Sequence, residues 1–133
     1  MLFRSKVDTN DVENAVWHYL CNARAVGVEK ARAAMLKIGK DRRVPMMEVY
    51  ALYAGKAKPD DVLTAARAGE PSKDDLNRRL FYAHLYLGLY YEVSGDARKA
   101  RSHLELAADK YRIGHYMGDV ARVHVMLLDR KEK

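Results

Sequence analysis

One segment limits the folds open to this chain more than any other, because it is apolar on almost every side of a helix. Residues 81–91 read Phe-Tyr-Ala-His-Leu-Tyr-Leu-Gly-Leu-Tyr-Tyr, and most of their polar side-chain atoms are phenol hydroxyls. A helix that is apolar all round must be covered all round. Gly88 in its middle costs up to about 1 kcal/mol relative to alanine. We therefore expect this helix at the centre of the molecule, with another helix passing close to Gly88.

The rest of the chain also has the pattern of helices. Glycine and proline separate apolar stretches of helical period, and no alternating, β-branched run occurs. Asn10, Ser72 and Asp96 are suited to cap helices, and Pro45 and Pro59 suit a first helical position. Helices are expected at residues 11–26, 28–38, 45–54, 59–68, 73–93, 97–111 and 120–128. Residues 1–133 are thus predicted to form a single all-α domain of about seven helices.

Composition excludes several classes of protein. With 49% hydrophobic and 32% charged residues, the chain is not generally disordered. Its single cysteine, Cys21, can form neither an internal disulfide nor a zinc site by itself. No apolar run approaches the roughly 18 residues that span a bilayer, and the charged start does not fit a signal peptide. We expect a chain that stays in the cytoplasm as it stands, or an envelope protein if a leader was removed.

A repeat pattern surrounds the central glycine. Its core positions are Leu87, Gly88, Tyr91, Gly95, Ala100, Leu104 and Ala107. In type and spacing they resemble a tetratricopeptide repeat, a unit of two antiparallel helices with small residues where the helices cross. His84 and Arg112 depart from the pattern, where tryptophan and proline are usual. The clearest unit covers about residues 81–114, and the resemblance implies a superhelix of antiparallel helical hairpins.

A fainter copy near the N-terminus extends the resemblance. Trp17, Leu20, Cys21 and Gly27 align with the same unit, although Arg24 replaces its tyrosine. From Val16 to Leu128 the chain is similar to bacterial tetratricopeptide proteins of the NlpI lipoprotein type. The resemblance implies a non-catalytic adaptor that docks peptidoglycan hydrolases or proteases at the cell envelope. The lipobox cysteine and signal peptide of such lipoproteins are missing from this sequence.

No residue pattern points to an enzyme, a metal or a cofactor. The five histidines, which show no metal-binding spacing, are His18, His84, His103, His115 and His124. His84 and His103 lie on the two helices of the clear repeat and can meet, yet two imidazoles without a third ligand make a poor site. Cys21 lies in an apolar helical stripe and is expected to be a buried, inert thiol. We expect no catalytic residue, no bound metal and no cofactor.

Two pairs of adjacent carboxylates have a structural explanation. Asp60 and Asp61 fall in the first turn of one predicted helix, and Asp74 and Asp75 in the first turn of another. Negative charge at these positions stabilises the helix dipole. We therefore do not expect these pairs to act as general acids or bases.

In tetratricopeptide proteins the first helix of each hairpin lines a concave groove. The resemblance therefore implies a partner-binding groove of Tyr82, Leu85, Tyr86, Leu89 and Glu92. Its apolar and aromatic character would suit an apolar or extended peptide. The alternative is that the preceding helix, residues 62–68, or another subunit covers these side chains.

The alternative function is binding of an anionic surface. The chain has a net charge of +6, and a basic excess lies between residues 24 and 43. The basic residues of this stretch are Arg24, Lys30, Arg32, Lys37, Lys40, Arg42 and Arg43, set against Glu29 and Asp41. They are spread around the helix without aromatic residues between them, so a solvated surface is favoured over nucleic-acid binding.

The last helix carries two apolar stripes. Val120, Val123 and Leu127 form one, and Ala121, Val125 and Leu128 form the other. A terminal helix of a repeat array should have a polar outer face, and the preceding hairpin cannot cover both stripes. We therefore expect a homodimer that forms through residues Val120 to Leu128.

Overall fold

The computed structural model describes residues 11–111, 113 and 116–132, and within the last helix the side chains of residues 118–127. In that part the chain forms seven α-helices and one short π-helical segment, and no strand. These are α1 (Val12–Val26), α2 (Val28–Ala33), α3 (Met46–Tyr53), α4 (Pro59–Arg67), α5 (Lys73–Val93), α6 (Ala97–Glu105), the π-helical segment η1 (Leu106–Lys110) and α7 (Tyr116–Glu132). The all-α prediction is confirmed. Asn10, Arg112, Gly114 and His115, for which the sequence pattern predicted roles, lie outside the described residues.

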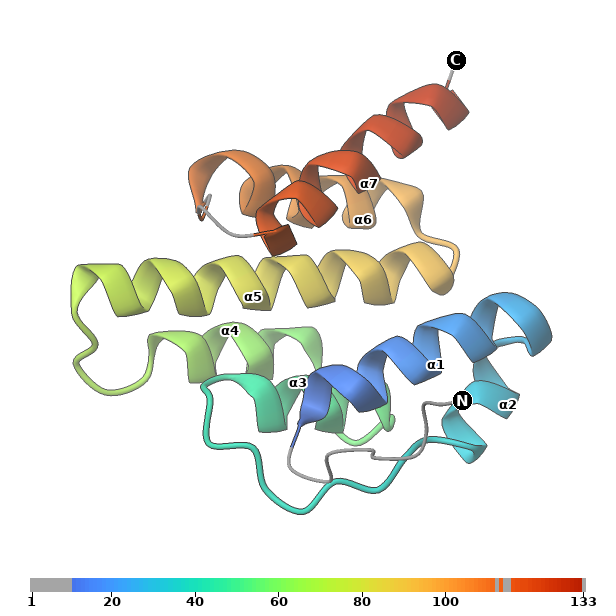
Figure 1. Cartoon of the computed structure of the whole chain (residues 1–133), viewed down its shortest axis with the longest axis horizontal. Helices are drawn as coiled ribbons and strands as arrows, with labels where there is room; N and C mark the ends of the chain where they lie inside the picture. Colours follow the sequence, from blue (N-terminus) through green and yellow to red (C-terminus); the bar gives the residue numbers. More distant parts are fainter. Residues whose placement is uncertain (1–10, 112, 114–115, 133) are drawn as a thin grey trace.

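Helix α5 lies at the centre of the molecule, as expected from its apolar surface. Figure 1 shows α6 and α7 on one side of it and α1, α3 and α4 on the other. Between Leu80 and Leu89 only Tyr82 is not fully buried. The bounds Lys73–Val93 agree with the sequence, because the Ser72 side chain caps the helix by accepting a hydrogen bond from the Asp75 N–H.

Helices α5 and α6 come into contact at Gly88. A Cβ atom at this position would lie 2.5 Å from Leu104 Cγ and 3.2 Å from the Ala100 carbonyl oxygen. The predicted close approach is therefore confirmed, and glycine is the residue that permits it. Leu87, Ala100, Leu104 and Ala107 are fully buried, whereas Tyr91 is partly buried.

On the other side of α5, tyrosines connect the helices. Tyr53 of α3 donates a hydrogen bond of 2.6 Å to the Tyr86 carbonyl oxygen of α5. The Tyr19 ring of α1 packs edge-on against Tyr53, and Trp17 of α1 packs edge-on against Tyr86. These contacts fix α1 and α3 against the side of α5 that faces away from α6.

Three helix boundaries differ from those expected. Helix α2 ends at Ala33 rather than near residue 38, because Met35 and Ile38 reach the core from irregular backbone instead of from a helical stripe. Helix α6 ends at Glu105 and continues as η1, where the Tyr111 N–H donates to the Leu106 carbonyl. The wider turn places the Tyr111 ring parallel to His84, with centroids 5.3 Å apart. Helix α7 begins at residue 116 rather than 120.

Among the described residues, none forms a helix with the length and apolar character needed to cross a bilayer.

Candidate functional site

The predicted groove is covered over most of its length. Leu85, Tyr86 and Leu89 are fully buried, and Tyr86 contacts Trp17 of α1 and Tyr53 of α3. Tyr82 is partly buried and stacks on Tyr86, with ring centroids 6.3 Å apart. The expectation that these residues line an open groove is therefore wrong, because the preceding helices occupy that side of α5. The covering described in the alternative extends beyond α4 to α1 and α3.

Glu92, the fifth predicted groove residue, lies in a cleft at the other end of α5. One of its carboxylate oxygens is 3.2 Å from Arg24 Nη2 of α1 and 3.0 Å from His124 Nδ1 of α7. This end cleft, of about 410 Å³, is lined by Ala23, Arg24, Glu92, Val93, His124 and Leu127. The cleft brings together Glu92 of the predicted groove, Arg24 of the basic stretch and Leu127 of the last helix.

The last helix has one apolar stripe packed and one exposed. Ala121 is fully buried and Val125 packs against the core. On the outer side, Val123 is 51% exposed, Met126 60% and Leu127 43%. These three residues, the α7 stripe, follow the spacing i, i+3, i+4 and so share one face of the helix. Val123 and Leu127 of the first predicted stripe are therefore exposed, beside the end cleft that Leu127 also lines, whereas Ala121 and Val125 of the second face the core.

Two other members of the predicted self-association surface differ from this picture. Val120 is partly buried and packs against the core, as does Val125. The side chain of Leu128 lies outside the described part of α7. Met126, which the sequence pattern did not include, is the most exposed apolar side chain of the stripe.

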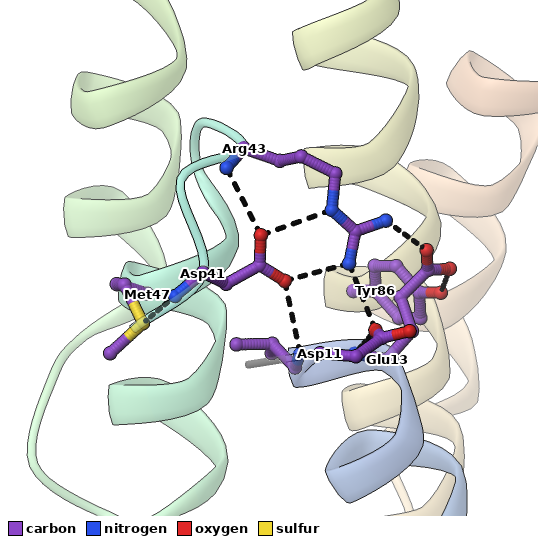
Figure 2. Close-up of polar contacts among 7 residues, drawn as sticks. Asp11, Glu13, Asp41, Arg43, Met47 and Tyr86 are labelled. Atoms are coloured by element: carbon purple, nitrogen blue, oxygen red, sulfur yellow. Dashed lines mark hydrogen bonds and ion pairs between the residues drawn. The ribbon is translucent and has the colours of Figure 1, made fainter. Parts of the chain in front are cut away.

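A polar cluster fixes the loop between α2 and α3. Figure 2 shows Arg43 between three carboxylates. Its guanidinium contacts Asp11 Oδ1 at 2.9 Å, Glu13 Oε1 at 2.6 Å and Asp41 Oδ2 at 2.6 Å. Asp41 also accepts a hydrogen bond from the Val12 N–H, the first residue of α1. Tyr86 of α5 donates to the second Glu13 oxygen.

The ionisation of this cluster follows from its contacts. Burial alone would raise the pKa of Asp41, but hydrogen bonds from the Arg43 side chain and the Val12 N–H lower that pKa below its usual value. The Asp41 hydrogen bond and the Glu13 contact raise the pKa of Arg43 in turn. Both shifts favour the charged forms of Asp41 and Arg43, and their ion pair anchors the loop.

The basic stretch is in part structural. Arg24 contacts Glu92, Arg43 contacts its three carboxylates, and Arg32 Nε donates to the Tyr53 carbonyl. Lys30, Lys37 and Arg42 are exposed. The residues after 33 lie on a loop rather than on a helix face, because α2 is shorter than predicted.

The two histidines of α5 and α6 meet, as the sequence suggested. His84 Nδ1 lies 2.9 Å from His103 Nδ1, and the rings of Tyr91 and Tyr111 stack on this pair. Burial, with a smaller contribution from His103, lowers the pKa of His84 to about 4. Within the described residues, no group of three or more potential metal ligands occurs.

The thiol of Cys21 is exposed, which contradicts the prediction of a buried side chain. The buried stripe of α1 runs through Val16, Tyr19, Leu20 and Ala23. Position 21 is turned away from this stripe by the helical period, so its alignment with the small-residue position of a repeat does not describe the packing.

Neither the end cleft nor the polar cluster was predictable from local motifs. Arg24 and Glu92 are 68 residues apart, and the cleft is formed by the C-terminal ends of α1 and α5 together with the middle of α7. Short spacing shows only that Asp41 and Arg43 lie close together, without the Glu13 and Asp11 contacts that complete the cluster. The chain matches no model of a known protein family and no curated protein.

Proposed function

We propose that this protein is a non-catalytic protein–protein interaction scaffold of the tetratricopeptide kind, which binds its partner along the α7 stripe. The observation that carries the proposal is the exposure of Val123, Met126 and Leu127 on one face of the last helix. The close approach of α5 and α6 at Gly88 supports the repeat resemblance, since such a unit requires small residues at its helix crossing.

The exposed stripe has an energetic consequence. Full burial of a valine, leucine or methionine side chain contributes about 1.5–3 kcal/mol, so three half-exposed side chains leave about 3 kcal/mol available. A residue spacing of i, i+3, i+4 suits the ridges of another helix, which pack into the grooves between such side chains. The partner element is therefore an amphipathic helix.

A second copy of this chain supplies such a helix. In a two-fold dimer each α7 stripe packs against the other, and the two stripes together provide about 6 kcal/mol. Part of this energy offsets the freedom that two chains lose on association. The dimer is thus weak and depends on concentration. By the NlpI-type resemblance, envelope hydrolases or proteases are the further partners that the dissociated stripe would receive.

The dimer is tested by substitution of the exposed valine. Val123→Glu places a charge in the stripe without touching the core, so it should give a monomer where the wild-type chain dimerises. Sedimentation velocity from micromolar to millimolar protein measures the mass. Val44→Glu, at an exposed valine on the loop before α3, is the matched control and should behave like wild type. A wild-type chain that stays monomeric throughout, or a Val123→Glu chain that still dimerises, would contradict the proposal.

A further inference from the structure

A second hollow lies where the α2–α3 loop meets the first half of α5, away from the α7 stripe. This arginine pocket has a volume of about 430 Å³, and its lining includes Arg42, Arg43, Asp75, Arg78, Arg79 and Tyr82. Small-molecule sites commonly have volumes of about 300–1,000 Å³. Four guanidinium groups and one phenol ring around such a hollow are an unusual concentration of groups suited to a ligand.

The positive charge available to a ligand comes from two of the four arginines, Arg42 and Arg79. Arg43 is neutralised by the carboxylates of the polar cluster, and its role there is structural. Arg78 shares its charge with Asp75, whose Oδ1 is 2.7 Å from Nη2. Arg79 donates one hydrogen bond to the Ala68 carbonyl, and a neutral partner leaves its charge uncompensated. The pocket therefore has a local excess of positive charge around Arg42 and Arg79.

Arg42 differs from its neighbours in the sequence in that its side chain takes no part in the polar cluster. It is exposed, and its guanidinium makes no hydrogen bond or ion pair with any residue in the described range. The polar cluster fixes both of its neighbours in the sequence, Asp41 and Arg43. The backbone that carries Arg42 is thus held in place while its side chain is available. An arginine on a fixed backbone loses less entropy when it binds than one on a mobile loop.

We propose that the arginine pocket binds a small ligand in which a phosphate group is attached to an aromatic ring system, as in a nucleotide. The planar guanidinium groups of Arg42 and Arg79 match phosphate oxygens in a forked geometry. Tyr82 offers its ring to the flat part of the ligand. Asp75, on the same wall, accepts a hydrogen bond from an amino or hydroxyl group of the ligand. This activity is independent of the α7 stripe.

The chemistry is tested by calorimetric titration of the full chain with three probes: adenosine monophosphate, inorganic phosphate and adenosine. The monophosphate should bind most tightly, because only it engages both the arginines and Tyr82. Loss of the phosphate should weaken binding about 10-fold or more, since hydrogen bonds to charged groups are the strong ones. Equal binding of adenosine and its monophosphate, or no binding at millimolar monophosphate, would overturn the proposal.

The residues are tested by Arg42→Gln and Arg79→Gln, each of which should weaken binding of the monophosphate about 10-fold or more. Arg98→Gln, at an exposed arginine of α6, keeps the same net charge as these variants and should bind like wild type. Arg79→Gln also removes the hydrogen bond to the Ala68 carbonyl and could unfold the chain. In that case Arg42→Gln is the variant that decides the test. An equal loss in Arg98→Gln would show binding by net charge alone and refute the pocket. The pocket would also be refuted if single-stranded oligonucleotides bound more tightly with increasing length and Arg42→Gln left their affinity unchanged.

Discussion

At the scale of single residues, the His84–His103 pair shows how burial controls a proton. The 2.9 Å contact between the two Nδ1 atoms needs one ring to donate and the other to accept, which two neutral imidazoles satisfy. A second positive charge beside the first would have no compensation between the stacked rings of Tyr91 and Tyr111. Burial is the main cause that lowers the pKa of both histidines below the usual value, with smaller contributions from His103 for His84 and from Lys99 for His103.

This pair makes stability depend on pH in the mildly acidic range. The pKa of His84 is about 4 in the folded chain and about 6.5 when unfolded, so the unfolded state binds more protons between these values. Stability is therefore complete above pH 6.5 and falls as the pH decreases towards 4, by about 3 kcal/mol from His84 alone. Urea unfolding at pH 7 and pH 5 measures this loss.

The matched variants are His84→Phe and His18→Phe. The first keeps a ring in the stack but cannot be protonated, so its stability should fall less between pH 7 and pH 5. The second replaces an exposed histidine of α1 and should keep the wild-type dependence. An unchanged slope in His84→Phe would mean that His84 is protonated in the folded chain at the same pH as in the unfolded one.

At the scale of elements, the contact of α5 with α6 depends on a missing Cβ atom. Gly88→Ala should gain up to about 1 kcal/mol of helix propensity, yet its Cβ would lie 2.5 Å from Leu104 Cγ. Leu104 is fully buried, so a shift away from the new Cβ would displace other core side chains. The variant should therefore be destabilised by about 1–3 kcal/mol, as overpacked cores are. Chemical denaturation measures the free energy of unfolding.

A double-mutant cycle distinguishes the clash from a general effect of alanine. Leu104→Ala removes the two nearest atoms that the new Cβ would meet and leaves the Ala100 carbonyl oxygen at 3.2 Å; by itself it should cost about 2–5 kcal/mol. In that background Gly88→Ala should cost much less than in the wild-type chain, so the two effects should not add. Additive effects of the two substitutions would be inconsistent with the observed crossing.

The sequence predicted elements better than it predicted surfaces. Ser72 and Asp96 cap their helices as expected, because capping depends on residues only a few positions apart. The closed side of α5 was not predictable, since an apolar side chain such as Leu85 suits a binding groove and a core equally well. Helix α2 ends earlier than predicted, and beyond it the Leu36 carbonyl accepts a hydrogen bond from Tyr50, a contact between segments that no local pattern contains.

At the scale of the whole molecule, α5 connects two groups of helices that barely meet otherwise. It contacts α6 on one side and α1, α3 and α4 on the other. Each group covers one half of a helix that cannot be exposed on either side. Loss of either group should therefore remove the other, and we expect one cooperative unfolding transition.

Trp17, the only tryptophan of the sequence, lets one group be followed separately. It lies on α1 and packs against Tyr86, with ring centroids 6.4 Å apart. In guanidinium chloride its fluorescence should change at the same midpoint as far-UV circular dichroism, which reports on all helices. A fluorescence midpoint at lower denaturant would show that α1 to α4 unfold while α5 to α7 remain folded.

The Arg43 cluster also bears on how a chain of this kind tolerates change in its length. The ion pairs join residue 43 to the start of α1. The chain between these two points, which includes α1, α2 and the irregular residues before α3, therefore forms a closed loop. Doubling the length of a flexible loop adds only about 0.6 kcal/mol to the entropy of closing it. Lys37 and Lys40 are both exposed. Residues inserted between them would thus lengthen the α2–α3 loop without moving α3. In this molecule the Arg43 ion pairs and the packing of Tyr53 hold α3 in place, and the number of residues that lead to it is free to vary.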